Sequence, residues 1–455
     1  MLPAESERMS HEFPSNSLHF AVVLAASLLP ASPASADVID PSMPRTLVVG
    51  APRGAAPSER LDAQRSGRSR TLLPAAPLHR WEHHITGGIE LAPVVDAHDN
   101  VLVVGTTPDA IKLDSEGKEV WRVRFGTSAA VVAPVLTSDG TLLIVTAAGQ
   151  AVGLSPAGSI RFVTALGLRG RDADTVPLAL DDGGVVIAAG GSLVEIDRDG
   201  AIRARTALEI KPGSADSRVT GALVQGPSTE TGPLGALFTT ESGSVFAWRP
   251  PLAPRKLGNL GGFPRRGAVV TGARTLTAVV DSRRIVDFDL PTGVTHVRLS
   301  SGSGAQIDGP VTIGPDGLLL AATQTGLLVG VDAAGNEAIR IALEKPPVAP
   351  PAGTGPTAGQ PGGSVNVFGG SAGGGPTSGF FGVPAEIRPS PALIIDRAGR
   401  IAFARASGRA GVVSPRGVVT LASERVCSSP VAALPAGEKR LLIACRDGGL
   451  WLYGE

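Results

Sequence analysis

A unit of about 42 residues recurs along this chain, and the recurrence constrains the fold more than any other feature. Each unit begins with a proline or small residue inside a short apolar segment. These anchors lie 39 to 46 residues apart, apart from one interval of 81, and comprise Pro93, Pro134, Pro177, Ala222, Ala268, Pro310, Pro391 and Pro430. Turn sequences such as SDG, DDGG and PDG separate further apolar segments, because glycine adopts positive φ and aspartate bonds its own backbone. Four short strands in a repeat of this length predict a β-propeller blade.

The eighth unit predicts how the ring closes. It ends at Glu455 after three strands, and a missing fourth strand would leave an open sheet edge. The sequence before Pro93 resembles the sequence before Pro134, so that Trp81 corresponds to Trp121. We therefore predict an all-β fold for residues 78–455: an eight-bladed propeller of four-stranded antiparallel blades, in which an N-terminal strand completes the last blade.

The unit IKLDSEGKEVWRVRFG carries a family resemblance. It resembles the repeat of the PQQ-like (pyrroloquinoline-quinone-like) propellers, whose A-x-D-x-x-G-x-x-x-W core appears here as Leu113-Asp114, Gly117 and Trp121. In other units the tryptophan is replaced by Ile202, Ile339 and Val419. The resemblance implies an eight-bladed fold in an extracytoplasmic setting. The family includes quinone-dependent dehydrogenases and non-catalytic members such as the propeller lipoprotein of the outer-membrane β-barrel assembly machinery.

The chain lacks the features that the quinone-dependent members need. Its two cysteines are not adjacent, and no D-x-D-x-D-G calcium loop occurs, since DAHDN (residues 96–100) reads as a hairpin turn. His83 and His84 are neighbours on a predicted strand and point to opposite faces, which disfavours a shared metal. We therefore predict no catalytic, cofactor-binding or metal-binding residues, and assign the chain to the non-catalytic branch.

Cys427 and Cys445 flank a predicted hairpin whose central residue, midway between them, is Ala436. They should then face each other across two adjacent strands, with Cα atoms roughly 4.5 Å apart. In an oxidising compartment such a pair forms a disulfide that staples the last blade.

The N-terminal region predicts export. An apolar segment from Phe20 to Leu29 precedes the small residues ASPASAD, which is typical of a signal peptide over residues 1–36, with translation starting at Met1 or Met9. Residues 37–77 show neither strand nor helix periodicity and predict a disordered Pro/Arg/Ser-rich linker. We therefore expect a periplasmic or secreted soluble protein without a transmembrane segment.

The 81-residue interval contains a Gly/Pro-rich insertion, residues 346–382, between blades six and seven, which we predict to be disordered. Its large apolar residues could add to the edge of a partner's sheet, although a tolerated surface insertion is the simpler interpretation; they are Val365, Val367, Phe368, Phe380 and Phe381.

The charge balance of the chain bears on its partners. Lys plus Arg equals Asp plus Glu, at 41 each, which disfavours nucleic acid as a partner. We predict a monomeric protein-binding or scaffolding module of the cell envelope. The alternatives are an enzyme that uses the central channel, either a quinone-dependent dehydrogenase or a carbohydrate-active protein, and a structural component of an envelope complex.

Overall fold

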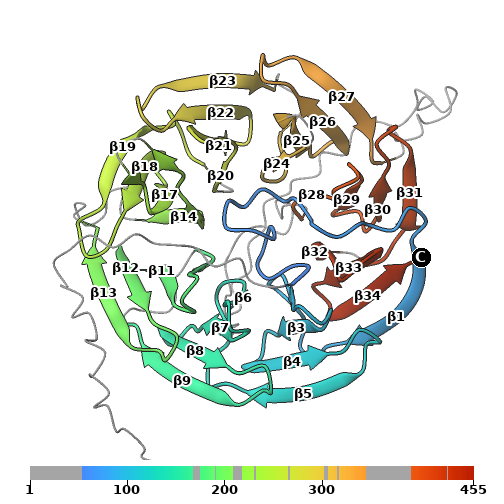
Figure 1. Ribbon diagram of the computed structural model, residues 1–455. Helices are drawn as coiled ribbons and strands as arrows, with labels where there is room; N and C mark the ends of the chain where they lie inside the picture. The colour runs from blue at the N-terminus through green and yellow to red at the C-terminus, as the bar shows by residue number, and fades with distance from the viewer. Residues whose placement is uncertain are drawn as a thin grey trace, which may run out of the picture. The chain divides into compact units, whose positions relative to one another are not determined.

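The strands form eight four-stranded antiparallel sheets arranged in a ring, which confirms the predicted eight-bladed propeller (Figure 1). The computed structural model describes residues 54–455 except 168–174, 190, 209–217, 230–231, 265–266, 302–305, 315–316, 345–390 and 428. The chain has two compact units, Met1–Pro41 and Ser42–Glu455, and the described residues all belong to the second. They contain no α-helix, and hence no helix that could span a membrane.

Blades one to four each run from the channel outward in chain order. Blade one comprises β2 (Val94–Val95), β3 (Val101–Val104), β4 (Asp109–Leu113) and β5 (Glu119–Arg124). Blade two comprises β6 (Val135–Leu136), β7 (Leu142–Val145), β8 (Gln150–Leu154) and β9 (Ile160–Ala165). Blade three comprises β10 (Leu178–Ala179), β11 (Val185–Ala189), β12 (Ser192–Ile196) and β13 (Ile202–Ala207). Blade four comprises β14 (Val219–Gln225), β17 (Ala236–Thr240), β18 (Ser244–Trp248) and β19 (Arg255–Asn259), with a small hairpin of β15 (Ser228–Thr229) and β16 (Gly232–Pro233) after β14.

Blades five to seven repeat this order, and blade eight differs in its outermost strand. Blade five comprises β20 (Ala268–Val270), β21 (Thr275–Val280), β22 (Arg284–Asp289) and β23 (Thr295–Ser300). Blade six comprises β24 (Thr312–Ile313), β25 (Leu319–Ala322), β26 (Leu327–Val331) and β27 (Glu337–Ala342). Blade seven comprises β28 (Ile394–Ile395), β29 (Ile401–Ala404), β30 (Ala410–Val413) and β31 (Val419–Ser423). Blade eight comprises β32 (Pro430–Pro435), β33 (Arg440–Cys445), β34 (Gly449–Gly454) and β1 (Leu78–His84).

The closure of the ring follows the prediction. β1 pairs antiparallel with β34, from Leu78 opposite Gly454 to His84 opposite Gly449, with an irregularity between His79 and Trp81. A strand from one end of the chain thus completes the blade formed by the other end. This pairing removes the open edge that β34 would otherwise present.

The burial of each strand explains why apolar and polar residues alternate in some strands of a blade and not in others. All residues of β3 and β7 are buried, because neighbouring blades cover both faces of these central strands. The outermost strands β5 and β9 instead alternate between exposed and half-buried residues. The core is therefore a series of apolar layers between consecutive blades.

The repeat positions hold consecutive blades together. The Nε1–H of Trp81, on β1, donates to the Ser115 carbonyl at 3.1 Å, and the Trp81 ring lies over Gly117 so closely that a Cβ there would lie 2.6 Å from Cδ2. The turn beneath is held by Asp114, whose Oδ1 accepts the N–H of Glu116 and of Lys118, both at 2.9 Å. A side chain at position 117 would therefore collide with the tryptophan of the preceding blade.

The same contact recurs at the next two junctions. Trp121 donates to the Pro156 carbonyl at 3.1 Å and covers Gly158. Phe162 covers Gly200. Blade two therefore has a phenylalanine at the repeat position where the motif has tryptophan. It lies four residues after Gly158, as Trp121 lies four residues after Gly117.

We predict that loss of the closing strand destabilises the whole ring. A chain lacking residues 1–85 should unfold at a lower denaturant concentration than a chain lacking residues 1–77, because only the former leaves β34 unpaired. Urea unfolding followed by circular dichroism measures this difference, with a chain lacking residues 1–53 as the control. Equal midpoints for the first two chains would contradict the role of β1.

Candidate functional site

A segment that the sequence predicts to be a disordered linker occupies the centre of the ring. Residues 54–77, here called the axial segment, run across the channel before β1 begins (Figure 1). Their buried side chains include Leu61, Arg65 and Leu73. The linker prediction is therefore wrong for residues 54–77, while residues 37–53 lie outside the described residues. The absence of a strand period misled the prediction, because this segment packs through its backbone, two arginines and apolar residues without a regular spacing, such as Leu61 and Leu73.

The axial segment binds the backbone of the innermost strands, blade after blade. Its carbonyl groups accept the N–H groups of residues at the ends of these strands: Val95 to Ala56 (2.7 Å), Leu136 to Pro57 (2.9 Å), Gln225 to Ala63 (2.9 Å), Val270 to Gln64 (3.2 Å), Ile313 to Ser66 (2.9 Å) and Ile395 to Gly67 (2.9 Å). In blade eight the Lys439 N–H donates to the Leu72 carbonyl at 2.8 Å. The first strand of a blade has no neighbouring strand on its channel side, so the six donors on these strands would otherwise lack a protein partner, whereas Lys439 lies in the turn between β32 and β33.

Arg65 supplies the contact with blade three and ties it to blade four. Its side chain is 1% exposed, and Nη2–H donates to the Pro177 carbonyl at 2.8 Å while Nε–H donates to the Leu223 carbonyl at 3.3 Å. A third bond, from Nη1–H to the Glu59 carbonyl at 2.7 Å, folds the segment around the guanidinium. Blade three is thus held by the side chain of Arg65, whereas the other blades donate backbone N–H groups to carbonyls of the axial segment.

Arg60 is the second buried cation of the axial segment. Its Nη2–H donates to the Val311 carbonyl of blade six, and its Nε has no hydrogen-bond partner among the described residues. Burial lowers the pKa of Arg60 to about 10, although Glu59 and Asp62 partly offset the effect. Neither Arg60 nor Arg65 forms an ion pair with a carboxylate of the described residues; ring carbonyls accept their hydrogen bonds, and the nearby charges of Glu59 and Asp62 also favour both cations.

The axial segment is conformationally strained. Arg60, Leu61 and Arg65 adopt φ values of 63°, 74° and 58°, in the left-handed region that costs a non-glycine residue about 1 kcal/mol or more. Bonds from Gly67 N–H to the Arg60 carbonyl (3.3 Å) and from Ser66 N–H to Asp62 Oδ1 (2.8 Å) keep the segment in this tight loop. Both bonds lie within the axial segment, so the segment itself helps to hold its left-handed residues in place.

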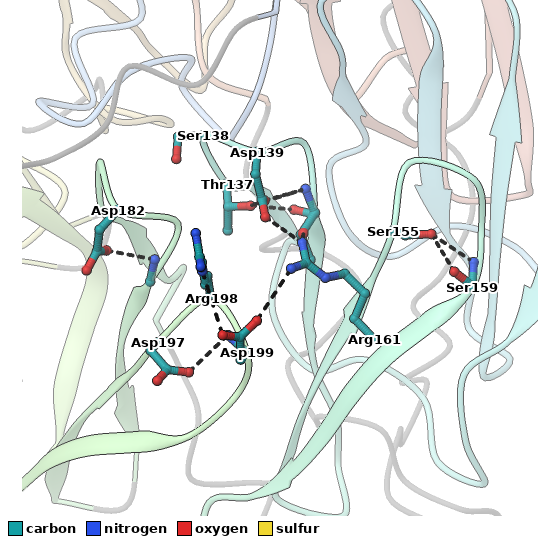
Figure 2. Close-up of polar contacts among 12 residues, drawn as sticks. Thr137, Ser138, Asp139, Ser155, Ser159, Arg161, Asp182, Asp197, Arg198 and Asp199 are labelled. Carbon is teal, nitrogen blue, oxygen red and sulfur yellow. Dashed lines mark hydrogen bonds and ion pairs between the residues drawn. The ribbon is translucent and has the colours of Figure 1, made fainter. Parts of the chain in front are cut away.

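A second set of polar residues lies on the turns of blades one to three. In each of these blades, the turn between the first and second strands carries an aspartate that forms an ion pair with a lysine or arginine side chain. The pairs are Asp96 with Lys112 (2.9 Å), Asp139 with Arg161, and Asp182 with Arg203. Figure 2 shows Arg161 between Asp139 of its own blade and Asp199 of blade three, 3.7 Å from Nη2. Each of the three pairs lies within one blade, and the Arg161–Asp199 contact joins blade two to blade three.

The pKa of Asp139 reflects this pairing. Partial burial raises it, but hydrogen bonds from Thr137, Arg161 and Thr141 outweigh that effect and lower the pKa from its ordinary 3.8 to about 2. A carboxylate with so low a pKa is a poor proton acceptor at neutral pH. The charged turns of blades two and three therefore have the properties of a structural contact rather than of an acid–base pair.

The two adjacent histidines, which the sequence disfavours as metal ligands, lie in the closing sheet. His83 and His84 lie opposite Leu450 and Gly449 in the closing sheet, one half-buried and one exposed. No cluster of three or more His, Cys, Asp or Glu side chains that could hold a metal occurs among the described residues. The insertion residues 346–382, including the five apolar residues predicted to bind a partner, lie outside the described part of the chain, between β27 and β28.

Cys427 and Cys445 form a disulfide, but not between the strand positions that the sequence predicts. The cross-strand partner of Cys445 is Pro430, and Cys427 precedes β32. The hairpin turns about Glu438, midway between the paired Pro435 and Leu441, rather than about Ala436. The Cα atoms are accordingly 6.2 Å apart, and the bond ties the connection from blade seven to β33 of blade eight.

Comparison with known proteins agrees with the observed fold. Residues 62–252 match the family model described as "Outer membrane protein assembly factor BamB". This match confirms the PQQ-like repeat. No curated protein matches the sequence significantly.

Two solved structures show the same architecture at low identity. BamB from Moraxella catarrhalis is 14% identical, with a TM-score of 0.54 over 83% of this chain and 100% of that one. The computationally designed Ika8 protein is 13% identical, with a TM-score of 0.56 over 85% of this chain and 100% of that one. At these identities the likeness establishes the propeller fold alone.

We predict that Asp139 contributes to stability in a pH-dependent way. Because its pKa is lower in the folded chain than in the unfolded chain, its contribution is fully present above about pH 4 and is lost as the pH falls towards 2. Asp139→Asn should therefore reduce the free energy of unfolding at pH 7 more than at pH 2.5, as measured by urea titration. Asp181→Asn, in an exposed neighbouring turn, is the control, and an effect of Asp139→Asn that does not vary with pH would contradict the prediction.

We predict that the disulfide stabilises the last blade. The double variant Cys427→Ala/Cys445→Ala should lose about 3 kcal/mol of unfolding free energy, the usual scale for a loop of this length. Reduction of the unmodified chain should lower its stability similarly. Thiol titration of the denatured, non-reduced chain should detect no free cysteine, and two reactive groups would refute the bond.

Proposed function

We propose that this chain is an exported, non-catalytic propeller that binds another protein and acts as a scaffolding module in the cell envelope. The main support for the proposal is that the axial segment occupies the central channel. An enzyme that uses the central channel needs that space for its substrate or cofactor, whereas here Leu61 and Arg65 are buried in it. The family model that matches residues 62–252 describes an outer membrane protein assembly factor, which favours a role beside other envelope proteins.

The proposal of export rests on two features of the chain. The sequence of residues 1–36 is typical of a signal peptide, and the Cys427–Cys445 bond suits an oxidising compartment. We place the protein in the periplasm or outside the cell.

The outer rim offers surfaces on which a partner could dock. Every blade ends in an outermost strand with one unpaired edge, and several of these strands expose apolar side chains, among them Val120 (54%) on β5 and Val163 (51%) on β9. Such edges accept an added strand from another protein. The insertion residues Val365, Val367, Phe368, Phe380 and Phe381 remain a second predicted contact, on sequence grounds alone.

The first test of this proposal is processing of the N-terminus. Mass spectrometry of the chain purified from its native envelope fraction should give an N-terminus at Asp37. An unprocessed chain in the cytoplasmic fraction would contradict export.

The second test is partner binding. Cross-linking in intact cells followed by capture should recover the same protein repeatedly, and the purified pair should co-elute in size-exclusion chromatography. A variant with the five apolar insertion residues replaced by serine keeps the insertion length and shows whether the contact lies there; a variant with Val120→Asp and Val163→Asp tests the rim. Quinone-dependent or glycan-dependent turnover by the purified chain would contradict the non-catalytic role.

A further inference from the structure

The surface beneath the axial segment recognises a polypeptide backbone. Its donors are the strand-end N–H groups of six blades and that of Lys439 in blade eight, all of which bind carbonyl oxygens of residues 56–72. Main-chain donors of this kind are indifferent to the side chains of the chain they bind. Another polypeptide that follows the same curved path could therefore satisfy them.

The same surface contains acceptors suited to arginine. The carbonyls of Pro177 and Leu223 receive two N–H groups of Arg65, and the carbonyl of Val311 receives one from Arg60. All three carbonyls belong to the ring, not to the axial segment. Arg65 is 1% exposed and makes these contacts without a carboxylate partner, so the surface selects a fork of N–H donors by geometry.

The axial segment occupies this surface at a conformational cost. Three of its non-glycine residues have left-handed φ values within six positions, and both buried arginines are desolvated, with Arg60 Nε lacking a partner among the described residues. Strained residues of this kind are found at ligand clamps and switch regions. A peptide that reaches the same donors without these left-handed residues would avoid this conformational cost.

We propose that the channel face is a binding site for an arginine-containing polypeptide, and that residues 56–72 are its intramolecular competitor. Binding of the partner displaces the axial segment, which remains tethered through β1. This proposal specifies where a protein partner binds, and it rests on the protein-binding function proposed above. The test below uses a purified chain and a synthetic peptide. Its failure would therefore count against this proposal alone, whereas a failed capture from cells would count against the proposed function.

The test compares three full-length mature chains: unmodified, Arg65→Ala, and Arg70→Ala. Arg70 lies in the same segment but is exposed. Arg70→Ala therefore removes one positive charge, as Arg65→Ala does, but removes no buried contact. The probe is a fluorescein-labelled peptide of residues 54–77, followed by anisotropy. We expect at least tenfold tighter binding to the Arg65→Ala chain than to the other two, because its own segment competes less well.

A second peptide tests the role of the arginine. The same labelled peptide carrying Arg65→Ala should bind the Arg65→Ala chain at least tenfold more weakly than the unsubstituted peptide. Equal affinity of the two peptides, or equal affinity of the unsubstituted peptide for all three chains, would overturn the proposal.

Hydrogen exchange on the unmodified chain keeps the proposal falsifiable if the variant does not fold. The amides of Leu136, Ile313 and Ile395 should exchange together and at least tenfold faster than those of central strands such as β3, reporting departure of the axial segment from an intact ring. Exchange of these amides only through global unfolding would show that the segment does not leave, and would overturn the proposal.

Discussion

The pairing of β1 with β34 is the interaction on which the rest of the structure depends. Each blade has a buried face only because the next blade covers it, so a ring that opens at one point exposes apolar layers on both sides of the gap. The closing blade takes its outermost strand from the start of the propeller and its other three from the end. Trp81, on that same strand, also covers Gly117 of blade one. One strand therefore completes the last sheet and joins it to the first.

Closing the outer ring leaves a second problem at its centre. Eight innermost strands point an unpaired edge at the channel, and their donors need acceptors. The axial segment supplies acceptors to six of these strands through its carbonyls and contacts blade eight at Lys439, whereas at blade three Arg65 instead donates to the Pro177 carbonyl. The hub of this propeller is thus built from the chain itself.

This arrangement bears on how the protein works. A channel filled by Leu61 and Arg65 is not an open pocket for a small substrate, and the charged turns of blades two and three are neutralised by their own Asp–Arg pairs (Figure 2). The surfaces that we propose for recognition are the outermost strands at the rim and the strand ends beneath the axial segment. Both surfaces suit polypeptide partners better than small molecules.

Several features were predictable from the sequence because they depend on local, repeated chemistry. The eight blades follow from anchors such as Pro93 and Pro134 together with Asp-Gly turns, and the correspondence of Trp81 with Trp121 identified the closing strand. The pairing of the two cysteines also follows from their position in one blade. The register of that hairpin does not, because a turn about Glu438 instead of Ala436 moves Cys427 out of the strand.

The sequence by itself thus determined the number of blades, their strand order and the closure of the ring, since each depends on turn and strand signals that recur along the chain. Only the tertiary structure decided the conformation of residues 54–77. Their contacts are made with seven different sheets by backbone atoms, which carry no side-chain pattern, and by Arg60 and Arg65, which as isolated residues read as solvated charges. The segment is positioned by contacts with strands that are distant in the sequence, and a local sequence pattern does not reveal such contacts.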